Sequence, residues 1–327
     1  KGFSYFEQLL APANITLNGA NSSDIKVSNE RLFRRVLRDG TLGLGEAYMD
    51  GWWDCEQLDE LVCRTLRSGL HHSIRNNWRF VVFSIFCRLF NLQSVQRAFM
   101  VGEKHYDIGN DVFEAMLDTH MNYSCGYWAS ARNLGEAQEH KMEMICHKLQ
   151  LEPGMRVLDV GCGWGGLSWW MAERHGVEVT GITVSKEQAE LAQNRCRDLP
   201  VTIELIDYRS LSGCYDRIVS VGMFEHVGRS GFDDYFSTIR RVLKPDGVAL
   251  VHAIGTMAPK GGSDAWIRKY IFPGGYTPSM SEIFAALERT GLKVLDVEFL
   301  RLHYAETLKH WSINFRANRD KVKALYD

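Results

Sequence analysis

The sequence lacks both a C-x-x-C pair and an apolar run long enough to cross a bilayer. Its longest largely apolar run, FVVFSIFC at residues 80–87, is well short of the roughly 20 residues that a membrane-spanning helix needs. The 8 cysteines are scattered without a His-rich spacing beside them, which predicts no metal site and favours a reducing compartment over a disulfide framework. Residues 1–20 show no signal peptide. We therefore expect a cytoplasmic protein that is soluble or rests on a surface.

Acidic residues are absent from the window 61–102. The window carries arginines interleaved with aromatic residues, namely Arg64, Arg67, Arg75, Arg79, Arg88 and Arg97 with Trp78, Phe80, Phe83, Phe86, Phe90 and Phe99. Two interpretations stay open: a helical linker with solvated arginines, or a basic aromatic face that meets anionic lipid headgroups. We expect no nucleic-acid partner, because the net charge is −2 and no nucleic-acid-binding motif is present.

The pattern of the chain changes twice and indicates three parts. We expect residues 1–69 to form a small, mostly helical N-terminal domain, residues 70–100 a basic, aromatic-rich helical linker, and residues 101–327 a larger third domain. In the last part, expected strands alternate with expected helices. The strands are expected at 156–160, 177–183, 201–206, 216–222, 247–253 and 292–299, and the helices at 165–175, 186–197, 232–243 and 279–290. This alternation predicts a doubly wound α/β sheet whose ligand lies at the carboxyl ends of the strands.

A glycine loop, VLDVGCGWGG at residues 157–166, lies between the first of these strands and a helix. Glycine lets backbone N–H groups approach a ligand closely, and the spacing formally fits a dinucleotide-binding loop. Such a loop expects an acid after the second strand, but that strand ends in GITVS, residues 181–185. Asp159 and Gly161 instead form a D-x-G-x-G pattern that resembles motif I of S-adenosylmethionine (SAM) methyltransferases.

Further motifs give the chain a resemblance to cyclopropane-fatty-acyl-phospholipid synthases over nearly its whole length. They are HYDIGND (105–111), MNYSCGYW (121–128), LDVGCGWGG, GMFEHVG (222–228), VHAIG (251–255), DAWIRKYIFPGG (264–275) and the N-terminal GLGEAYMDGWWDC. The resemblance implies a Rossmann-like, seven-stranded SAM methyltransferase sheet. It also implies transfer of a methylene carbon from SAM to the cis double bond of an unsaturated acyl chain in a membrane phospholipid, which forms a cyclopropane ring.

The chemistry of this reaction calls for an anion in a dry site. An alkene is a poor nucleophile, so methyl transfer leaves a positive charge on the acyl chain, and a base must remove a proton before water intervenes. The resemblance implies that a bound bicarbonate is this base. Its expected ligands are Cys125 and Ile254 through backbone groups, and Glu225, His252 and Tyr304 through side chains.

The resemblance also implies a set of SAM-binding residues. They are Tyr123, Ser124, Gly161, Gly163, Thr183, Gln188, Tyr208 and Arg209, with His105 and Tyr106 lining the same pocket. Asp207 is an alternative acceptor for the adenine amine. The aromatic residues Trp266, Tyr270, Phe272 and Tyr276 either line an acyl tunnel or pack in an ordinary core.

The lipid substrate places the expected enzyme on the inner face of the cell membrane, as a peripheral protein and a homodimer. The resemblance makes residues 1–69 the expected lipid- or membrane-associated domain and residues 101–327 the expected SAM-dependent catalytic domain. The end of the sequence, NFRANRDKVKALYD at residues 314–327, is typical of a helix cut in mid-run, so we expect a truncated C-terminal end. Two alternatives remain: a SAM-dependent N-methyltransferase of a small amine, and a non-catalytic lipid-binding relative.

Overall fold

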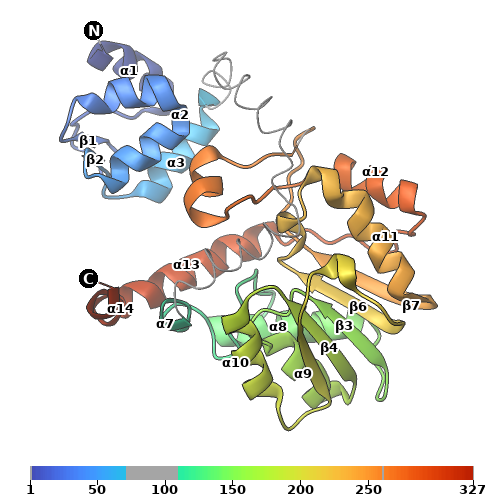
Figure 1. The fold of residues 1–327 in the computed structure, drawn as a ribbon. Coiled ribbons are helices and arrows are strands. Elements are labelled where there is room, and N and C mark those ends of the chain that lie inside the picture. Colours follow the sequence, from blue (N-terminus) through green and yellow to red (C-terminus); the bar gives the residue numbers. More distant parts are fainter. Residues whose placement is uncertain (1, 71–109, 260, 327) are drawn as a thin grey trace. The chain divides into compact units, whose positions relative to one another are not determined.

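The computed structural model describes residues 2–70, 110–259 and 261–326, which fall into two compact units (Figure 1). The described part of the first unit comprises residues 2–70 and the distant segment Ser263–Phe272. All other described residues belong to the second unit. Residues 71–100 of the expected linker, together with His105 and Tyr106, lie outside the described residues.

The first unit is mostly helical, as the sequence predicted. It contains α1 (Gly2–Leu10), α2 (Arg31–Met49), α3 (Leu58–Arg67) and a two-stranded antiparallel sheet of β1 (Lys26–Val27) and β2 (Trp53–Asp54). Its core is small and apolar, and includes Phe6, Leu10, Ile15, Leu32, Phe33, Ala47, Trp53 and Leu61. This core makes the N-terminal region a packed unit in its own right.

The segment Ser263–Phe272 packs against α2 within the first unit. A Cβ atom added to Gly45 would lie 2.3 Å from Cδ1 of Trp266, so the indole lies directly on the helix backbone at this glycine. The carboxylate of Glu46 accepts hydrogen bonds from Lys269 Nζ at 2.6 Å and Tyr270 Oη at 3.0 Å. The glycine and the acid of the N-terminal GLGEAYMDGWWDC motif therefore bind the DAWIRKYIF segment.

This packing separates the four aromatic residues considered for an acyl tunnel. Trp266, Tyr270 and Phe272 belong to the first unit, whereas Tyr276 belongs to the second. There the Tyr276 ring lies 6.1 Å from the ring of Phe232. A role of these residues in an acyl channel stays a prediction.

The second unit contains a parallel sheet, which confirms the doubly wound α/β fold. The strand order is β5-β4-β3-β6-β7. The strands are β3 (Arg156–Val160), β4 (Glu178–Thr183), β5 (Val201–Leu205), β6 (Tyr215–Val221) and β7 (Leu243–His252). All five were predicted to within four residues at each end.

The expected strand at 292–299 is wrong. This segment has no regular secondary structure, and its Leu295 and Phe299 side chains are 79% and 62% exposed. A strand needs a neighbour for its backbone hydrogen bonds, and β7 is the last strand of the sheet that the described residues form. That part of the chain therefore has a five-stranded sheet rather than the expected seven strands.

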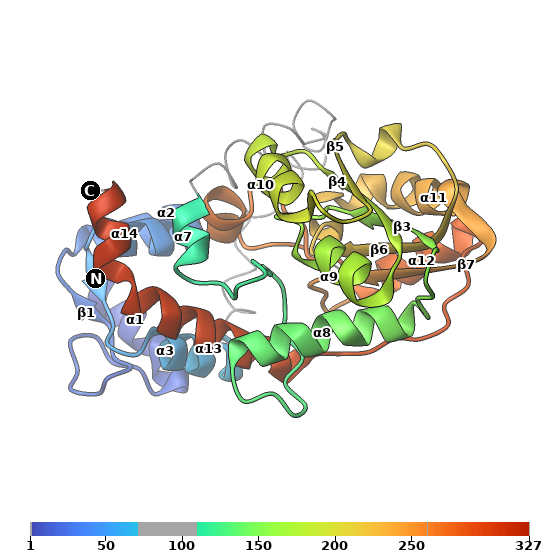
Figure 2. The same cartoon turned by 90° about the horizontal axis from the view of Figure 1, so that it is seen from below.

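Helices cover both faces of the sheet (Figures 1 and 2). Leu158 and Ile218 point to the face that packs on α11 (Phe232–Val242) and α12 (Met280–Thr290). Their neighbours Val157 and Val219 point to the opposite face, against α8 (Leu134–Lys148) and α9 (Gly166–His175), because successive strand residues alternate between faces. Helix α10 (Lys186–Cys196) packs beside β5.

Local sequence signals explain where these helices begin and end. The side chains of Asn133, Ser185 and Ser279 accept hydrogen bonds from the first turns of α8, α10 and α12. Gly176 and Gly291 end α9 and α12 in the left-handed conformation that glycine adopts without strain. The sequence analysis predicted α9, α10, α11 and α12 but did not identify α8.

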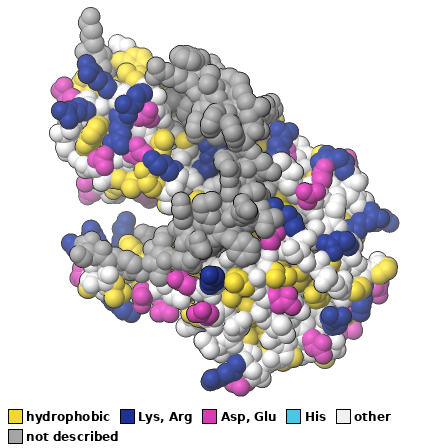
Figure 3. All heavy atoms as spheres, viewed as in Figure 1, with side chains coloured by type: hydrophobic (Ala, Val, Ile, Leu, Met, Phe, Trp, Pro, Cys, Tyr) yellow, Lys and Arg dark blue, Asp and Glu magenta, His cyan; other side chains and the backbone are white. Residues whose placement is uncertain are grey.

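The described part of the second unit also contains the helices α7 (Asn110–Glu114), α13 (Arg301–Ala317) and α14 (Arg319–Tyr326). No helix within the described ranges is both long and apolar enough to span a membrane. On the face that Figure 3 shows, basic and acidic side chains of the described residues are intermixed, in keeping with the net charge of −2.

Candidate active site

The glycine loop after β3 has free space beside one of its glycines, Gly163. Gly161 and Gly163 have φ angles of 85° and 54°, which disfavour any other residue. The N–H groups of Gly161 and Cys162 donate to the carbonyl of Ile182 at 3.0 and 2.9 Å, which fixes the loop against the end of β4. A Cβ atom at Gly161 would lie 2.8 Å from Met223 Cβ, whereas one at Gly163 would meet no atom of the described residues within 4 Å. The space beside Gly163 is therefore open to a ligand.

Thr183 follows Ile182, the residue that the loop contacts, and both Thr183 and Gln188 are buried. Thr183 Oγ1 donates to Gln188 Oε1 at 2.9 Å, so the two side chains orient each other. Ser185, between them, caps α10. The ends of β3 and β4 thus present their polar groups at one edge of the sheet, where ligands bind in doubly wound folds.

Tyr208 and Arg209 follow β5 in a short 3-10 helix, Tyr208–Ser210. Arg209 donates from Nε and Nη2 to both carboxylate oxygens of Asp207, each at 2.7 Å. This bidentate pair holds the guanidinium beside the Tyr208 ring, 5.3 Å from its centroid. Tyr208 itself is buried in the core against Tyr235. Asp207 therefore orients Arg209, and this pairing was not foreseen.

Tyr123 and Ser124 lie on the segment that precedes α8. The Tyr123 ring packs between Phe113 and Trp311, with centroids 5.3 and 5.2 Å away. Ser124 Oγ accepts a hydrogen bond from Lys141 Nζ at 2.9 Å. This arrangement gives the segment an aromatic side and a polar side.

Glu225 lies just after β6, in the short 3-10 helix Phe224–His226. Its Oε1 accepts a hydrogen bond from the backbone N–H of Ile254 at 2.6 Å. Its Oε2 is buried and has no hydrogen-bond partner in the described part of the chain. Burial raises the pKa of this carboxyl to about 7, because water is removed from its charged form. A neutral or readily protonated carboxyl thus stands at the end of β6.

His252 is the last residue of β7, and its backbone carbonyl accepts from Gly222 N at 2.9 Å. Burial, and secondarily the positive charge of Lys141, lowers the pKa of His252 to about 4, so the imidazole is neutral. Its Nδ1 is buried and, as far as the described residues extend, has no hydrogen-bond partner. Burial also lowers the pKa of His226 to about 4.

Helix α13 carries Tyr304 and binds the segment that contains Cys125. Thr307 Oγ1 accepts from Gly126 N at 3.0 Å, which ties the residue after Cys125 to this helix. Burial raises the pKa of the Cys125 thiol to about 11, so it stays protonated. Burial likewise raises the pKa of Tyr304, and the negative forms of Tyr123, Glu225 and Cys125 raise it further. The Tyr304 side chain packs in the aromatic cluster that contains Tyr123 and Trp311.

Lys141 is the site-adjacent residue that sequence analysis missed. It is buried, its Nζ contacts Ser124 next to Cys125, and its positive charge contributes to the lowered pKa of His252. A lysine in the polar run GEAQEHK is typical of a solvated helix face, so the sequence offered no signal for it.

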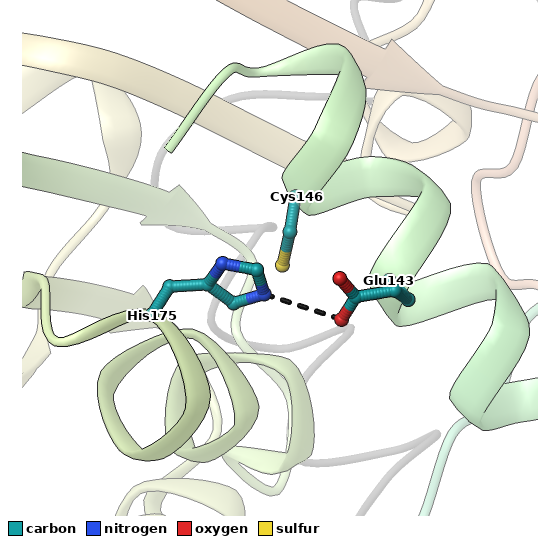
Figure 4. A group of neighbouring side chains, drawn as sticks. All are labelled: Glu143, Cys146 and His175. Carbon is teal, nitrogen blue, oxygen red and sulfur yellow. Dashed lines mark hydrogen bonds and ion pairs between the residues drawn. The ribbon is translucent and has the colours of Figure 1, made fainter. Parts of the chain in front are cut away.

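A second group of reactive side chains lies between α8 and α9, namely Glu143, Cys146 and His175 (Figure 4). Their ligand atoms all lie within 4.8 Å of one another, and His175 Nε2 is 3.2 Å from Glu143 Oε2. The carboxylate already pairs with His147 and Trp170, and burial raises the pKa of the Cys146 thiol to about 12. A protonated thiol is a poor metal ligand, so we interpret the group as helix packing, and the absence of a metal site stays a prediction.

Comparison of the sequence with those of known proteins points to one family. The family model for mycolic acid cyclopropane synthetase matches residues 93–327. The cyclopropane-fatty-acyl-phospholipid synthase of Escherichia coli (strain K12) is 50% identical over 310 residues, which cover 95% of this chain and 81% of that protein. The tuberculostearic acid methyltransferase UfaA1 of Mycobacterium tuberculosis is 34% identical over 324 residues, covering 90% of this chain and 73% of that protein.

Solved structures agree. Mycolic acid cyclopropane synthase CmaA1, complexed with SAH and CTAB, has a TM-score of 0.65 at 34% identity, covering 70% of this chain and 86% of that one. Coclaurine N-methyltransferase has a TM-score of 0.66 at 21% identity, covering 86% of this chain and 84% of that one, and this likeness shows the fold alone. The resemblance found in the sequence is thereby confirmed. The chain belongs to the mycolic acid cyclopropane synthetase family of SAM-dependent methyltransferases.

Proposed function

We propose that this protein transfers a methylene carbon from SAM to the cis double bond of an unsaturated acyl chain in a membrane phospholipid, and that bound bicarbonate is the base. The observation that carries the proposal is a pair of buried polar atoms, Glu225 Oε2 and His252 Nδ1, that lack hydrogen-bond partners among the described residues. Buried polar atoms without partners are rare in native structures and call for a ligand or water. The 50% identity to the cyclopropane-fatty-acyl-phospholipid synthase of E. coli supports the proposal that the substrate is a phospholipid.

The residues fit a small oxyanion. The carboxyl of Glu225, with its pKa near 7, can donate a proton to an anion from Oε2 while Oε1 holds Ile254 N. Neutral His252 presents Nδ1 as a donor or an acceptor, depending on its tautomer. The Tyr304 hydroxyl, whose pKa is raised, stays protonated and can also donate. These three side chains offer the donors that a carbonate-type anion accepts.

SAM supplies the methyl group, and bicarbonate accepts the proton that leaves it. Gly163 offers open space at the end of β3, which fits close approach of a ligand to the backbone. Thr183 and Gln188, which follow β4, and Ser124 are the polar side chains that we propose to bind SAM. The aromatic rings of Tyr123, Phe113 and Trp311 keep water away, so that a positive charge on the acyl chain survives until the proton is removed.

Lipid access completes the proposal. The chain acts on the inner face of the cell membrane as a peripheral homodimer, and the acid-free window 61–102 makes the contact with anionic headgroups. Most of that window, including Arg75 and Arg79, lies outside the described residues.

Lipid mass spectrometry tests the function directly. The protein is incubated with SAM and vesicles of a monounsaturated phospholipid, with bicarbonate present or rigorously removed. We expect the acyl chain to gain one CH₂ and lose its ozone-reactive double bond, at a rate that falls without bicarbonate. A gain of CH₂ on an amine, with the double bond retained, would show an N-methyltransferase instead.

A further inference from the structure

Lys141 is a buried cation that pairs with no carboxylate of the described residues. It lies on α8 with 1% of its surface exposed. Its Nζ donates to Asn122 Oδ1 at 2.8 Å and to Ser124 Oγ at 2.9 Å, and both acceptors are neutral. Within the ranges that the structure describes, its ammonium forms no ion pair. Because an ammonium has three N–H donors, one remains beyond these two bonds.

The two carboxylates near Lys141, those of Asp118 and Asp159, form hydrogen bonds with other groups. Asp118 accepts from the backbone N–H groups of His120 and Asn122, at 3.0 and 2.8 Å, and from the Asn122 amide at 3.0 Å. Asp159 Oδ2 accepts from Ser168 Oγ at 2.7 Å. These bonds leave the two carboxylates near the ammonium but not in contact with it, so its charge is only partly compensated.

The field of this ammonium extends into the candidate active site. Ser124, which Lys141 contacts, precedes Cys125, and the positive charge of Lys141 also acts on His252. Asp159 begins the D-x-G-x-G loop. One buried cation thus lies behind both the expected cofactor segment and the expected bicarbonate ligands.

We propose that Lys141 is a positioning residue that gives the active site its affinity for a carboxylate- or carbonate-type anion, by fixing Ser124 and holding a positive potential behind Ser124, Cys125 and His252. Two anions of this chemistry belong to the proposed function, on which this inference rests: the methionyl carboxylate of SAM, and bicarbonate. A neutral residue at this position removes the potential from both, and the anion that depends on it loses affinity.

The test uses the whole protein and measures binding without turnover. Lys141→Met and the unchanged protein are titrated by calorimetry with S-adenosylhomocysteine and with its analogue that lacks the carboxylate. Bicarbonate enriched in ¹³C is titrated separately and followed by NMR line broadening. The control is Lys148→Met, the same change on the same helix at a lysine that pairs with Asp296 and Glu298 at the surface.

We expect Lys141→Met to lower the affinity for at least one of the two anions about tenfold or more, because a charge-assisted interaction is lost. The affinity for the carboxylate-free analogue should change less than about twofold. Loss confined to S-adenosylhomocysteine assigns the effect to the cofactor carboxylate, and loss confined to bicarbonate assigns it to the base. The Lys148→Met control should bind all three ligands as the unchanged protein does.

Two results overturn the inference. One is a folded Lys141→Met protein that binds both anions normally, and the other is an equal loss for the carboxylate-free analogue, which indicates a purely structural role. If Lys141→Met does not fold, Lys141→Gln decides, because its amide N–H groups can replace the bonds to Asn122 and Ser124 while the charge is lost, and it should show the same anion-specific loss. If the unchanged protein forms no cyclopropane lipid, the proposed function is rejected. The affinities of Lys141→Met relative to the unchanged protein would still test the role of Lys141.

Discussion

Oε1 of Glu225 accepts a hydrogen bond from the backbone N–H of Ile254, with an N···O distance of 2.6 Å. This bond joins the loop after β6 to the segment after β7. Sequence analysis assigned a backbone group of Ile254 to the anion. In the structure, the N–H of Ile254 donates to Glu225. The other carboxyl oxygen of Glu225 is buried and has no hydrogen-bond partner among the described residues. Ile254 therefore orients the carboxyl, and Glu225 presents one oxygen to a ligand.

Replacement of Glu225 by Gln should lower the rate of cyclopropane formation by about 100-fold or more, with unchanged SAM affinity, because the buried carboxyl is lost from the base site. Product formation measured by lipid mass spectrometry and SAM binding measured by calorimetry separate the two effects. A variant that keeps its rate would remove Glu225 from the site.

The same variant should change how stability depends on pH. Burial raises the pKa of Glu225 from 4.5 to about 7, so its contribution to stability is complete below pH 4.5 and is lost as the pH rises through about 7. The loss is about 3 kcal/mol in the free energy of unfolding. Urea denaturation across pH 4.5–8 should show this slope in the unchanged protein and a flatter one in Glu225→Gln.

His252→Asn should flatten the acid side of the stability curve. Burial lowers the pKa of His252 from 6.5 to about 4, so its contribution to stability is present above pH 6.5 and is lost as the pH falls through about 4. His226 has the same shift, so part of the slope should remain. Denaturation at pH 4 to 7 measures the effect, with His147→Asn, at a 74% exposed side chain, as the control. An identical slope in His252→Asn and the unchanged protein would contradict a buried, neutral imidazole.

Gly163→Ala should weaken SAM binding more than it weakens the fold. The added Cβ meets no atom in the described part of the chain and projects into the space beside the loop. The φ of 54° at this position costs about 1–2 kcal/mol in the free energy of unfolding. Gly154→Ala is the matched control, because Gly154 has a φ of 81° and equally open surroundings at the start of β3. Calorimetry with SAM and thermal unfolding should show a similar stability loss in both variants, and an affinity loss in Gly163→Ala alone.

Glu46→Gln should loosen the Ser263–Phe272 segment. Its hydrogen bond with Lys269, and next that with Arg35, lowers the pKa of Glu46 to about 2, so the stabilisation is present above pH 4.5 and lost as the pH falls towards 2. At neutral pH, we expect faster tryptic cleavage at Arg268 and Lys269, followed by mass spectrometry. Glu60→Gln, which removes an exposed pair with Arg64 in the same unit, should leave this cleavage unchanged.

Arg75→Glu combined with Arg79→Glu should abolish sedimentation with anionic vesicles at low salt and leave SAM affinity intact, since about 1 kcal/mol of membrane attraction is lost per arginine. A matched control reverses Arg132 and Arg197, whose side chains are 86% and 76% exposed. Sedimentation that survives the first double change would reject the acid-free window as the membrane contact.

The sequence by itself determined the five strands, the glycine loop and four of the flanking helices. These follow from local causes: alternation of apolar residues, side-chain caps, and glycine where φ is positive. Strand formation at 292–299 depends on a distant partner, so its β-like composition alone predicted it wrongly. Only the tertiary structure decided that Lys141 is buried and that Glu225 binds Ile254, because residues far apart in the sequence make these contacts. It also decided that Trp266 packs on Gly45, since burial and charge compensation depend on which surfaces meet in three dimensions.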